Sequence, residues 1–221
     1  MPVIMPSAHR DCSTCQFRYA TLSALEYHNK MDSIANFLFE VGMLSRTPRS
    51  GYQFLGSGTE SVAEHILRTV FVGYTLCKMD DSLDELRVLK MCVLHDLPEA
   101  RTGDMNYVNK KYVDVDEAKA VKELTDELFF GKDIRSAIEE FNAKETKESL
   151  IARDADQIAL ILQLKECGDL GNKYSEEWIS YALQRLTTEN GKKLSERIIK
   201  TDSSHWWFKE KGSWWVNGNN R

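Results

Sequence analysis

Helical periodicity along nearly the whole chain is the feature that most restricts its fold. Apolar residues recur at intervals of three and four, as on one face of an α-helix, and the alternation typical of strands is almost absent. Loops rich in Pro, Gly or polar residues separate the periodic segments. The segments expected to be helical are 22–44, 60–79, 82–97, 114–130, 144–168, 175–188 and 191–200. This pattern predicts an all-α protein, a single-domain helical bundle of seven or so helices.

The length and composition also favour one domain. The chain has 221 residues, with no internal repeat and no low-complexity linker, and this length is sufficient for one substantial core. We expect the domain to cover residues 31–200. An N-terminal extension over 1–30 precedes it, and an aromatic tail over 201–221 follows it.

Charge and hydropathy exclude several classes of partner. The net charge is only −5 and no basic stripe is present, so we expect no nucleic-acid partner. No apolar stretch reaches the roughly 18 residues that cross a bilayer, and the N-terminus lacks the apolar centre of a secretory signal. We therefore expect a cytoplasmic protein without a membrane partner. The five cysteines are odd in number, which argues against a disulfide framework.

One charged pair interrupts an apolar segment. The stretch "VLHDLPEARTGD" places His95 and Asp96 at the end of the segment 82–97, which is expected to be central in the bundle. An ionised aspartate buried there costs several kcal/mol unless it is paired or binds a metal. A hydrogen-bonded core pair would also satisfy both groups, and the dipeptide alone is a weak indication of function.

Two other helical segments carry further candidate ligands. His65 lies in the segment 60–79, and Asp154 and Asp156 lie among apolar residues of the segment 144–168. Histidine and aspartate ligands from three helices suit a divalent transition metal (Mn, Co, Fe, Ni or Zn), with Mg also admissible, rather than Ca. The spacing does not choose between Asp154 and Asp156, because both have apolar neighbours three and four residues away.

The combination of "VAEH", "HDLPEARTGD" and "RDADQI" resembles the HD superfamily of metal-dependent phosphohydrolases over roughly residues 31–190. The loop "LSRTPRSGY" and the acidic residues after the His-Asp pair resemble the superfamily's 5′-deoxynucleotidase branch. The resemblance implies a metal-dependent 5′-nucleotidase that hydrolyses (deoxy)nucleoside 5′-monophosphates to nucleoside and phosphate. It also implies a small-molecule nucleotide substrate and a homodimer.

The resemblance assigns roles to individual residues. Asp156, rather than Asp154, matches the family pattern. Glu99 and Asp104 match two further acidic residues of the active site, and the sequence does not rank them as activators of water or helpers of the leaving group. The residues that match the metal ligands are His65, His95, Asp96 and Asp156.

Two arginines in the loop before residue 60 are candidates for holding the phosphate. Arg46 matches the family's phosphate-proximal arginine, and Arg49 is a second candidate in the same loop. Some members have an aromatic residue after that arginine, which helps to select a sugar without a 2′-hydroxyl. This chain has Thr47 there, so the origin of any deoxyribose preference is open.

Two alternative functions compete with the nucleotidase. The first is another HD phosphohydrolase activity, such as removal of a 3′-pyrophosphate from the guanosine alarmone (p)ppGpp. The second is a metal-bound, non-catalytic interaction module. The presence of all the expected ligands and acidic residues disfavours the module, and Asp104 with the "RTPRSG" loop favours the nucleotidase over the alarmone hydrolase.

Both ends of the chain carry features outside this pattern. Cys12, Cys15 and His28 have the spacing of the first three ligands of a zinc finger, but no further His follows at the required distance, so free thiols are the simpler interpretation. The tryptophans of the tail could stack on bases, but such clusters more often pack an extension onto its own domain or a partner subunit.

Overall fold

The computed structural model describes residues 24–209, 212 and 214–218. In these residues it consists of helices and the loops that connect them. Eight of the described helices have nine or more residues, and no strand is assigned within the described ranges. The all-α, single-domain prediction is confirmed. The long helices are α1 (Ala24–Val41), α3 (Val62–Cys77), α4 (Glu85–Leu94), α6 (Glu117–Thr125), α7 (Gly131–Ala143), α8 (Lys147–Asp169), α9 (Ser175–Leu183) and α10 (Glu189–Ile199). The short ones are η1 (Gly42–Ser45), α2 (Tyr52–Leu55), α5 (Glu99–Thr102), η2 (Asn109–Lys111), α11 (His205–Phe208) and α12 (Trp214–Asn217).

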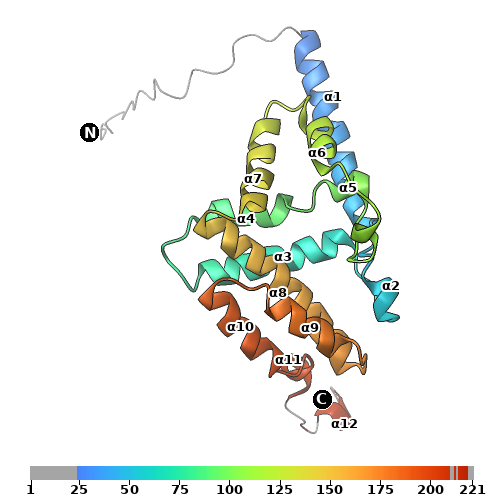
Figure 1. Cartoon of the computed structure of the whole chain (residues 1–221), viewed down its shortest axis with the longest axis vertical. Helices are drawn as coiled ribbons and strands as arrows, with labels where there is room; N and C mark the ends of the chain where they lie inside the picture. Colours follow the sequence, from blue (N-terminus) through green and yellow to red (C-terminus); the bar gives the residue numbers. More distant parts are fainter. Residues whose placement is uncertain (1–23, 210–211, 213, 219–221) are drawn as a thin grey trace, which may run out of the picture.

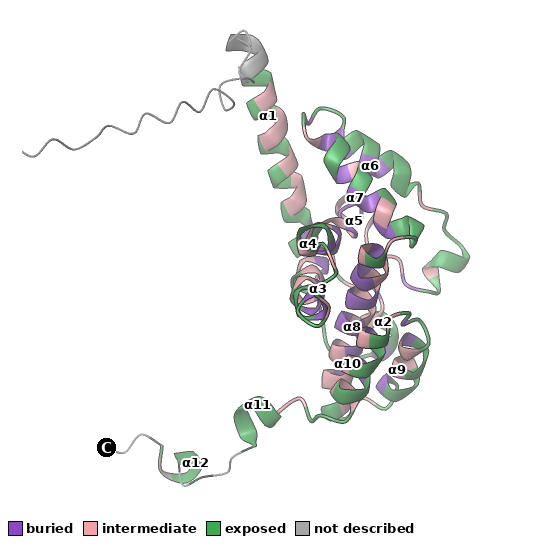
Figure 2. Ribbon diagram, turned by 90° about the vertical axis from the view of Figure 1, so that its left-hand side faces the viewer, coloured by how far each residue is buried: buried purple, intermediate pink, exposed green. Residues whose placement is uncertain are grey.

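Helix α8 is the central element of the bundle. It packs against α3, α4, α7, α9 and α10, and Figure 1 shows it running through the middle of the molecule. Ile158, Ile161 and Leu164 on this helix are fully buried. Figure 2 shows buried residues along α8 and the inner sides of its neighbours. A helix that is enclosed on most sides is rigid, and it is therefore a suitable support for a functional group.

A second core lies between the N-terminal elements and the helices that follow α5. Leu44 of η1, Val62 of α3, Leu97 and Leu124 of α6 belong to this cluster. It packs α6 and α7 against the region of α1, η1 and α5, as Figure 1 shows. The two cores meet at α3 and α4, because partly buried Leu94 contacts both clusters.

The sequence placed the end of one helix incorrectly. The segment 82–97 ends as α4 at Leu94, so His95 is the residue that caps the helix and Asp96 lies in the turn before α5. The segment is also less enclosed than expected, since Val93 is 47% exposed. The turn allows the two polar side chains to leave the apolar core and face a pocket.

Gly131 directly follows the segment 114–130 that was expected to be one helix, and it begins α7. Helix α6 ends earlier, at Thr125, and a turn connects the two helices. A Cβ atom on Gly131 would lie only 2.0 Å from the Thr125 carbonyl oxygen. Glycine is therefore required for close approach of two backbones rather than for a helix end.

The loop 45–59 contains the short helix α2 and is fixed to the start of α3. An isolated antiparallel bridge joins Pro48 to Ser61, and the Arg49 N–H donates to the Glu60 carbonyl at 2.8 Å. Ser61 caps α3 with a reciprocal capping box that includes Glu64. The bridge and the cap hold this loop against the first turn of α3.

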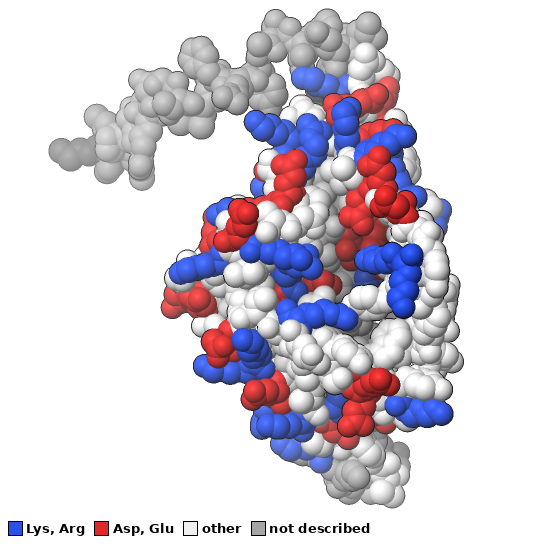
Figure 3. Space-filling view, viewed as in Figure 1, with Lys and Arg blue, Asp and Glu red and all other residues white. Residues whose placement is uncertain are grey.

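Figure 3 shows Lys and Arg interspersed with Asp and Glu on the face seen in Figure 1. Within the described ranges, no helix is long and apolar enough to cross a membrane. Helices α11 and α12 extend away from the bundle in Figure 2. Trp206 is 87% exposed, so this ring does not pack on its own domain, and packing on a partner subunit stays a prediction. Cys12 and Cys15 lie outside the described residues.

Candidate metal centre and its pocket

His95 presents one ring nitrogen to a pocket at the centre of the molecule. Its Nδ1 lies 3.0 Å from the Cys92 carbonyl oxygen, to which it donates, and this places the free lone pair on Nε2. That Nε2 atom is buried and has no hydrogen-bond partner in the described part of the chain. A buried imidazole held by a carbonyl on one side, with an unpaired nitrogen on the other, is typical of a metal ligand.

His65 reaches the same point from the first turns of α3. The residue is fully buried, and its Nε2 lies 3.0 Å from Asp156 Oδ1. Its other nitrogen, Nδ1, is buried without a partner among the described residues. The capping box at Ser61 fixes the start of α3 and therefore the position of His65 one turn later.

The structure separates the two aspartates of α8. Both carboxylate oxygens of Asp154 accept hydrogen bonds from the N–H and hydroxyl groups of Thr187 and Thr188, at the N-terminus of α10. Asp156 points toward His65 instead, because two residues along a helix turn the side chain by about 200°. Although burial alone would raise it, the pKa of Asp156 is lowered by the hydrogen bond with His65 and by the charges of His65, His95 and Arg49.

Three of the expected ligands form a compact cluster. One donor atom each of His65, His95 and Asp156 lies within 4.8 Å of the others. Asp96 Oδ2 is 3.3 Å from Nε2 of His95 and 3.7 Å from Nε2 of His65. Burial would raise the pKa of Asp96, but His95, His65 and Arg49 lower it to about 2, so the group is a carboxylate. Two imidazoles and two carboxylates fit a transition metal, and the buried Nε2 atom of His95, which makes no hydrogen bond and faces Asp96, supports that fit.

Two further acidic residues face this cluster from the segment after α4. Asp104 follows α5, and its Oδ2 accepts hydrogen bonds from the Ser50 backbone N–H and from the Ser50 hydroxyl. Glu99 lies in α5 with a buried Oε2 atom that has no hydrogen-bond partner among the described residues. Desolvation by burial, together with the charges of Asp96 and Asp104, raises the pKa of Glu99 to about 9. In the metal-free protein the Glu99 carboxyl is therefore protonated near neutral pH.

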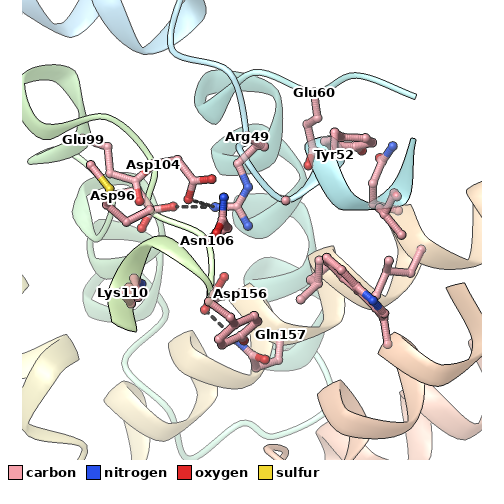
Figure 4. Close-up of a pocket in the computed structure, with 18 residues that line it drawn as sticks. Arg49, Tyr52, Glu60, Asp96, Glu99, Asp104, Asn106, Lys110, Asp156 and Gln157 are labelled. Carbon is pink, nitrogen blue, oxygen red and sulfur yellow. Dashed lines mark hydrogen bonds and ion pairs between the residues drawn. The ribbon is translucent and has the colours of Figure 1, made fainter. Parts of the chain in front are cut away.

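Only one of the two candidate arginines reaches the pocket. Arg49 Nη1 lies 3.5 Å from Asp96 Oδ2 and 3.6 Å from Asp104 Oδ1, and Figure 4 shows the guanidinium between these carboxylates. Burial opposes its charge, but the surrounding carboxylates raise the pKa of Arg49. Arg46, the first choice from the sequence, caps η1, is exposed and does not line the pocket. The bridge between Pro48 and Ser61 turns Arg49 inward instead.

Several pocket residues were not recognised in the sequence. Thr47 does not line the pocket, but the aromatic ring of Tyr52, five residues later, does. Asn106 and Tyr107 follow Asp104 on the same loop and also line the pocket. Their closeness to Asp104 in the sequence was the one feature that could have indicated them. The unrecognised residues of the pocket that can bind or position a ligand are Tyr52, Glu60, Asn106, Tyr107, Lys110, Gln157, Gln163 and Trp178.

A hydrogen-bonded chain supports Asp156 from outside. The amide nitrogen of Gln157 donates to Asp156 Oδ2 at 2.9 Å, and Arg185 Nη1 donates to Gln157 Oε1 at 3.2 Å. The Arg185 guanidinium also lies 4.6 Å from the ring centroid of Tyr107, on the loop after Asp104. These contacts connect α8 with the loop on the opposite side of the pocket, as do the groups around a metal site that orient its ligands.

A helical bundle with a His-Asp pair at a turn and further His and Asp ligands from two central helices defines an HD domain. The HD domain family matches residues 41–198, and this chain belongs to that family. The chain is 30% identical over 148 residues to the 5'-deoxynucleotidase HDDC2 of Mus musculus, covering 63% of this chain and 72% of that protein. It is 29% identical over 144 residues to the 5'-deoxynucleotidase hdd1 of Schizosaccharomyces pombe, covering 61% and 72% of the two chains. A solved structure of a conserved hypothetical protein from Pyrococcus furiosus is similar with a TM-score of 0.66 and 28% identity, covering 76% of this chain and 99% of that one.

Proposed function

We propose that this protein is a metal-dependent 5′-nucleotidase that hydrolyses (deoxy)nucleoside 5′-monophosphates to nucleoside and phosphate. The observation that carries the proposal is the meeting of a His-Asp cluster, a partly buried arginine and two further carboxyl groups in one pocket. Such a pocket contains what phosphate-ester hydrolysis requires, namely a metal site, a phosphate-binding cation and proton-transferring groups. The relatives named 5'-deoxynucleotidase support this substrate class.

The metal would be held by His65, His95, Asp96 and Asp156. Their nitrogen and oxygen donors suit Mn²⁺, Co²⁺, Fe²⁺, Ni²⁺ or Zn²⁺, and Mg²⁺ is also admissible. When bound, the ion supplies an acidified water and neutralises charge on the phosphoryl group.

Arg49 would bind the phosphate. Its guanidinium is charged and lies beside the ligand cluster, and its planar fork matches two phosphate oxygens. The contacts at 3.5 and 3.6 Å with Asp96 and Asp104 are long, so N–H groups remain available to a substrate. Arg49, rather than Arg46, is therefore the phosphate-binding residue of the proposal.

Glu99 and Asp104 would divide the proton transfers. Burial and the charges of Asp96 and Asp104 raise the pKa of Glu99 in the metal-free protein, which favours it as the donor of a proton to the leaving 5′-oxygen. Asp104 is held by Ser50 with one oxygen and can orient the attacking water or accept its proton with the other. The assignment follows from the different surroundings of the two groups.

The alternatives from the sequence are less well supported. A non-catalytic module would not need an acidic pair beside its metal ligands, and both Glu99 and Asp104 line the pocket. No observation in the pocket specifically favours a 3′-pyrophosphate of a guanosine alarmone. That substrate belongs in the test as a comparison.

The decisive test is phosphate release by metal-stripped protein resupplied with Mn²⁺, Co²⁺, Mg²⁺ or Zn²⁺. Deoxy- and ribonucleoside 5′-monophosphates are compared side by side, with a guanosine 3′-pyrophosphate and an Asp96→Ala variant. Metal-dependent release from the monophosphates that the variant lacks is expected. Release from the pyrophosphate alone, or from no substrate while metal is bound, would contradict the proposal.

Three expectations from the sequence stay predictions. These are the domain limits 31–200, a cytoplasmic location and a homodimer. Multi-angle light scattering of the full chain is the direct measurement of the oligomeric state, and a mass near 25 kDa rather than twice that value would exclude the dimer.

A further inference from the structure

The pocket has a second, less charged side that the proposed chemistry does not use. Figure 4 shows Glu60 and Tyr52 on the opposite side of Arg49 from Asp96, Glu99 and Asp104. Apolar side chains complete this side, and they come from α2, α8 and α9. The remaining residues on these elements that line the pocket are Gly51, Leu55, Gln157, Leu160, Gln163, Leu164 and Trp178.

Glu60 is the unusual residue of this side. It is only 7% exposed, yet its carboxylate makes no hydrogen bond and no ion pair with any described residue. Its backbone carbonyl accepts the Arg49 N–H at 2.8 Å, so its position beside the phosphate-binding arginine is fixed. A buried carboxylate without donors is costly, and such a group is retained where a ligand supplies the missing hydrogen bond.

Tyr52 and Trp178 extend the site around Glu60. The Tyr52 hydroxyl is buried and makes no hydrogen bond of normal geometry with the described residues, although Glu60 and Gln163 lie close to it. The ring of Trp178 lies beside Gly51, where a Cβ atom would contact it at 3.5 Å. An acceptor, a hydroxyl and an aromatic ring thus line one side of the pocket within reach of Arg49.

We propose that Glu60, assisted by Tyr52, binds the sugar of the nucleotide by accepting a hydrogen bond from its 3′-hydroxyl group. This inference rests on the proposed nucleotidase function. A carboxylate repels phosphate, so the phosphate lies toward Arg49 and the ligand cluster, and the uncharged nucleoside lies toward Glu60. Sugar hydroxyls are donors, and the 3′-hydroxyl is the one that ribose and deoxyribose share. Glu60 therefore recognises a nucleoside without selecting between the two sugars.

The test compares substrates that differ by one hydroxyl. Initial rates are measured with a 2′-deoxynucleoside 5′-monophosphate, its 2′,3′-dideoxy analogue and p-nitrophenyl phosphate, using the wild type and Glu60→Gln with metal restored. The wild type is expected to favour the deoxy substrate over the dideoxy one by about 10- to 100-fold in kcat/KM, as for loss of a hydrogen bond to a charged group. Glu60→Gln is expected to lose most of that preference through KM, and its rate with p-nitrophenyl phosphate, which has no sugar, is the reference for the rates with the two nucleotides.

Two controls separate recognition from folding. Glu166→Gln removes a partly exposed carboxylate that forms an ion pair with Arg68 and does not line this pocket, and it should keep the wild-type preference. Metal content and the melting temperature of Glu60→Gln are measured in parallel, and both should match the wild type. Tyr52→Phe should reduce the preference by a smaller factor.

Calorimetric titration of the metal-free protein with a 2′-deoxynucleoside and with its 2′,3′-dideoxy analogue gives a readout that does not depend on turnover. The deoxynucleoside is expected to bind more tightly to the wild type, and the difference should vanish in Glu60→Gln. Equal binding and equal kcat/KM of the two wild-type substrates, or an unchanged preference in Glu60→Gln, would overturn this inference while leaving the nucleotidase function intact. Absence of all phosphate release would refute the function, and the titration would still decide the role of Glu60.

Discussion

The two aspartates of α8 show how similar residues acquire different roles from the regions that they face. Asp154 faces the start of α10, where neutral N–H and hydroxyl donors of Thr187 and Thr188 satisfy both of its oxygens. Asp156 lies in the pocket, where its neighbours are His65, Gln157 and the charges of His95 and Arg49. A buried carboxylate that is saturated by neutral donors stabilises a fold, whereas one surrounded by other titratable groups belongs to a site.

The largest effect is expected from replacing the aspartate that faces the pocket. Asp156→Asn should lower metal-dependent activity by about 1,000-fold or more, because one ligand of the ion is lost and losses even in the surrounding shell cost about 10- to 100-fold. Metal content after dialysis, measured by plasma mass spectrometry, should fall in parallel. Retention of both metal and activity would show that the pocket is not the metal site.

Glu99 is a further carboxyl group of the pocket, and replacing it tests the roles of these acidic residues in another way. Glu99→Gln should keep its metal but lower turnover by about 100- to 1,000-fold, because the proton donor is lost. The measurement is kcat at saturating substrate together with metal content. Unchanged turnover would remove Glu99 from the mechanism.

The same variant should change the pH dependence of stability. The folded-state pKa of Glu99 is raised to about 9, so the folded metal-free protein binds this proton more tightly than the unfolded chain. Its contribution to the free energy of unfolding is therefore present at low pH and is lost as the pH rises from the ordinary glutamate range, about 4.3, toward 9. Urea denaturation of the metal-free wild type should show this decline, and Glu99→Gln should show less of it.

Asp154→Ala should damage the fold and leave the site chemistry in place. Loss of this buried carboxylate removes the hydrogen bonds that its two oxygens accept from Thr187 and Thr188, which we expect to lower the free energy of unfolding by about 2–4 kcal/mol. Denaturant melts provide the measurement. The folded fraction should still bind metal, and a variant that is stable but metal-free would reverse the assignments of the two aspartates.

The two arginines of the loop before α3 form a matched pair. Arg49→Lys should reduce kcat/KM by about 10- to 100-fold, since a point charge replaces the planar fork beside Asp96 and Asp104. Arg46→Lys changes an exposed side chain outside the pocket and should stay within about twofold of the wild type. A larger effect at residue 46 than at residue 49 would restore the assignment made from the sequence.

The smallest effect is expected from the outer support of Asp156. Gln157→Ala removes the amide that donates to Asp156 Oδ2 and accepts from Arg185, and it should weaken metal binding by about tenfold. Competition with a chelator of known affinity measures the change. Gln157→Glu, which replaces the donor by an acceptor, should be at least as damaging, and a tighter metal site in either variant would contradict the supporting role.

The sequence predicted the helical class because helical periodicity is a local property. The set His65, His95, Asp96 and Asp156 was expected from the family resemblance, and the structure places these residues at one pocket. The sequence did not distinguish Asp154 from Asp156 without the family pattern, since their difference depends on where α10 packs. Arg46 and Arg49 were both candidates from the sequence, and only the structure shows that Arg49 lines the pocket, because the bridge between Pro48 and Ser61 is a long-range contact.

Other features depended on approach distances that a sequence pattern does not contain. Gly131 begins a helix because a neighbouring carbonyl leaves no space for a Cβ atom. Glu60 and Tyr52 enter the pocket because the loop folds back on α3, and neither has a periodic or motif signal that marks it as a pocket residue. The residues that carry the family pattern were therefore more predictable than the residues that only the folding of a loop or helix packing brings to the pocket.

The pocket residues on core helices and those on connecting segments differ in how freely they can change during divergence of the family. His65 and Asp156 stand on α3 and α8, the helices that also carry the core, so a change in their geometry would disturb the whole bundle. Arg49, Tyr52, Glu60 and Asp104 stand on connecting segments, which tolerate insertion and substitution. Changes in the loop before α3 and in the loop after α5 can therefore alter the substrate while His65 and Asp156 stay in place.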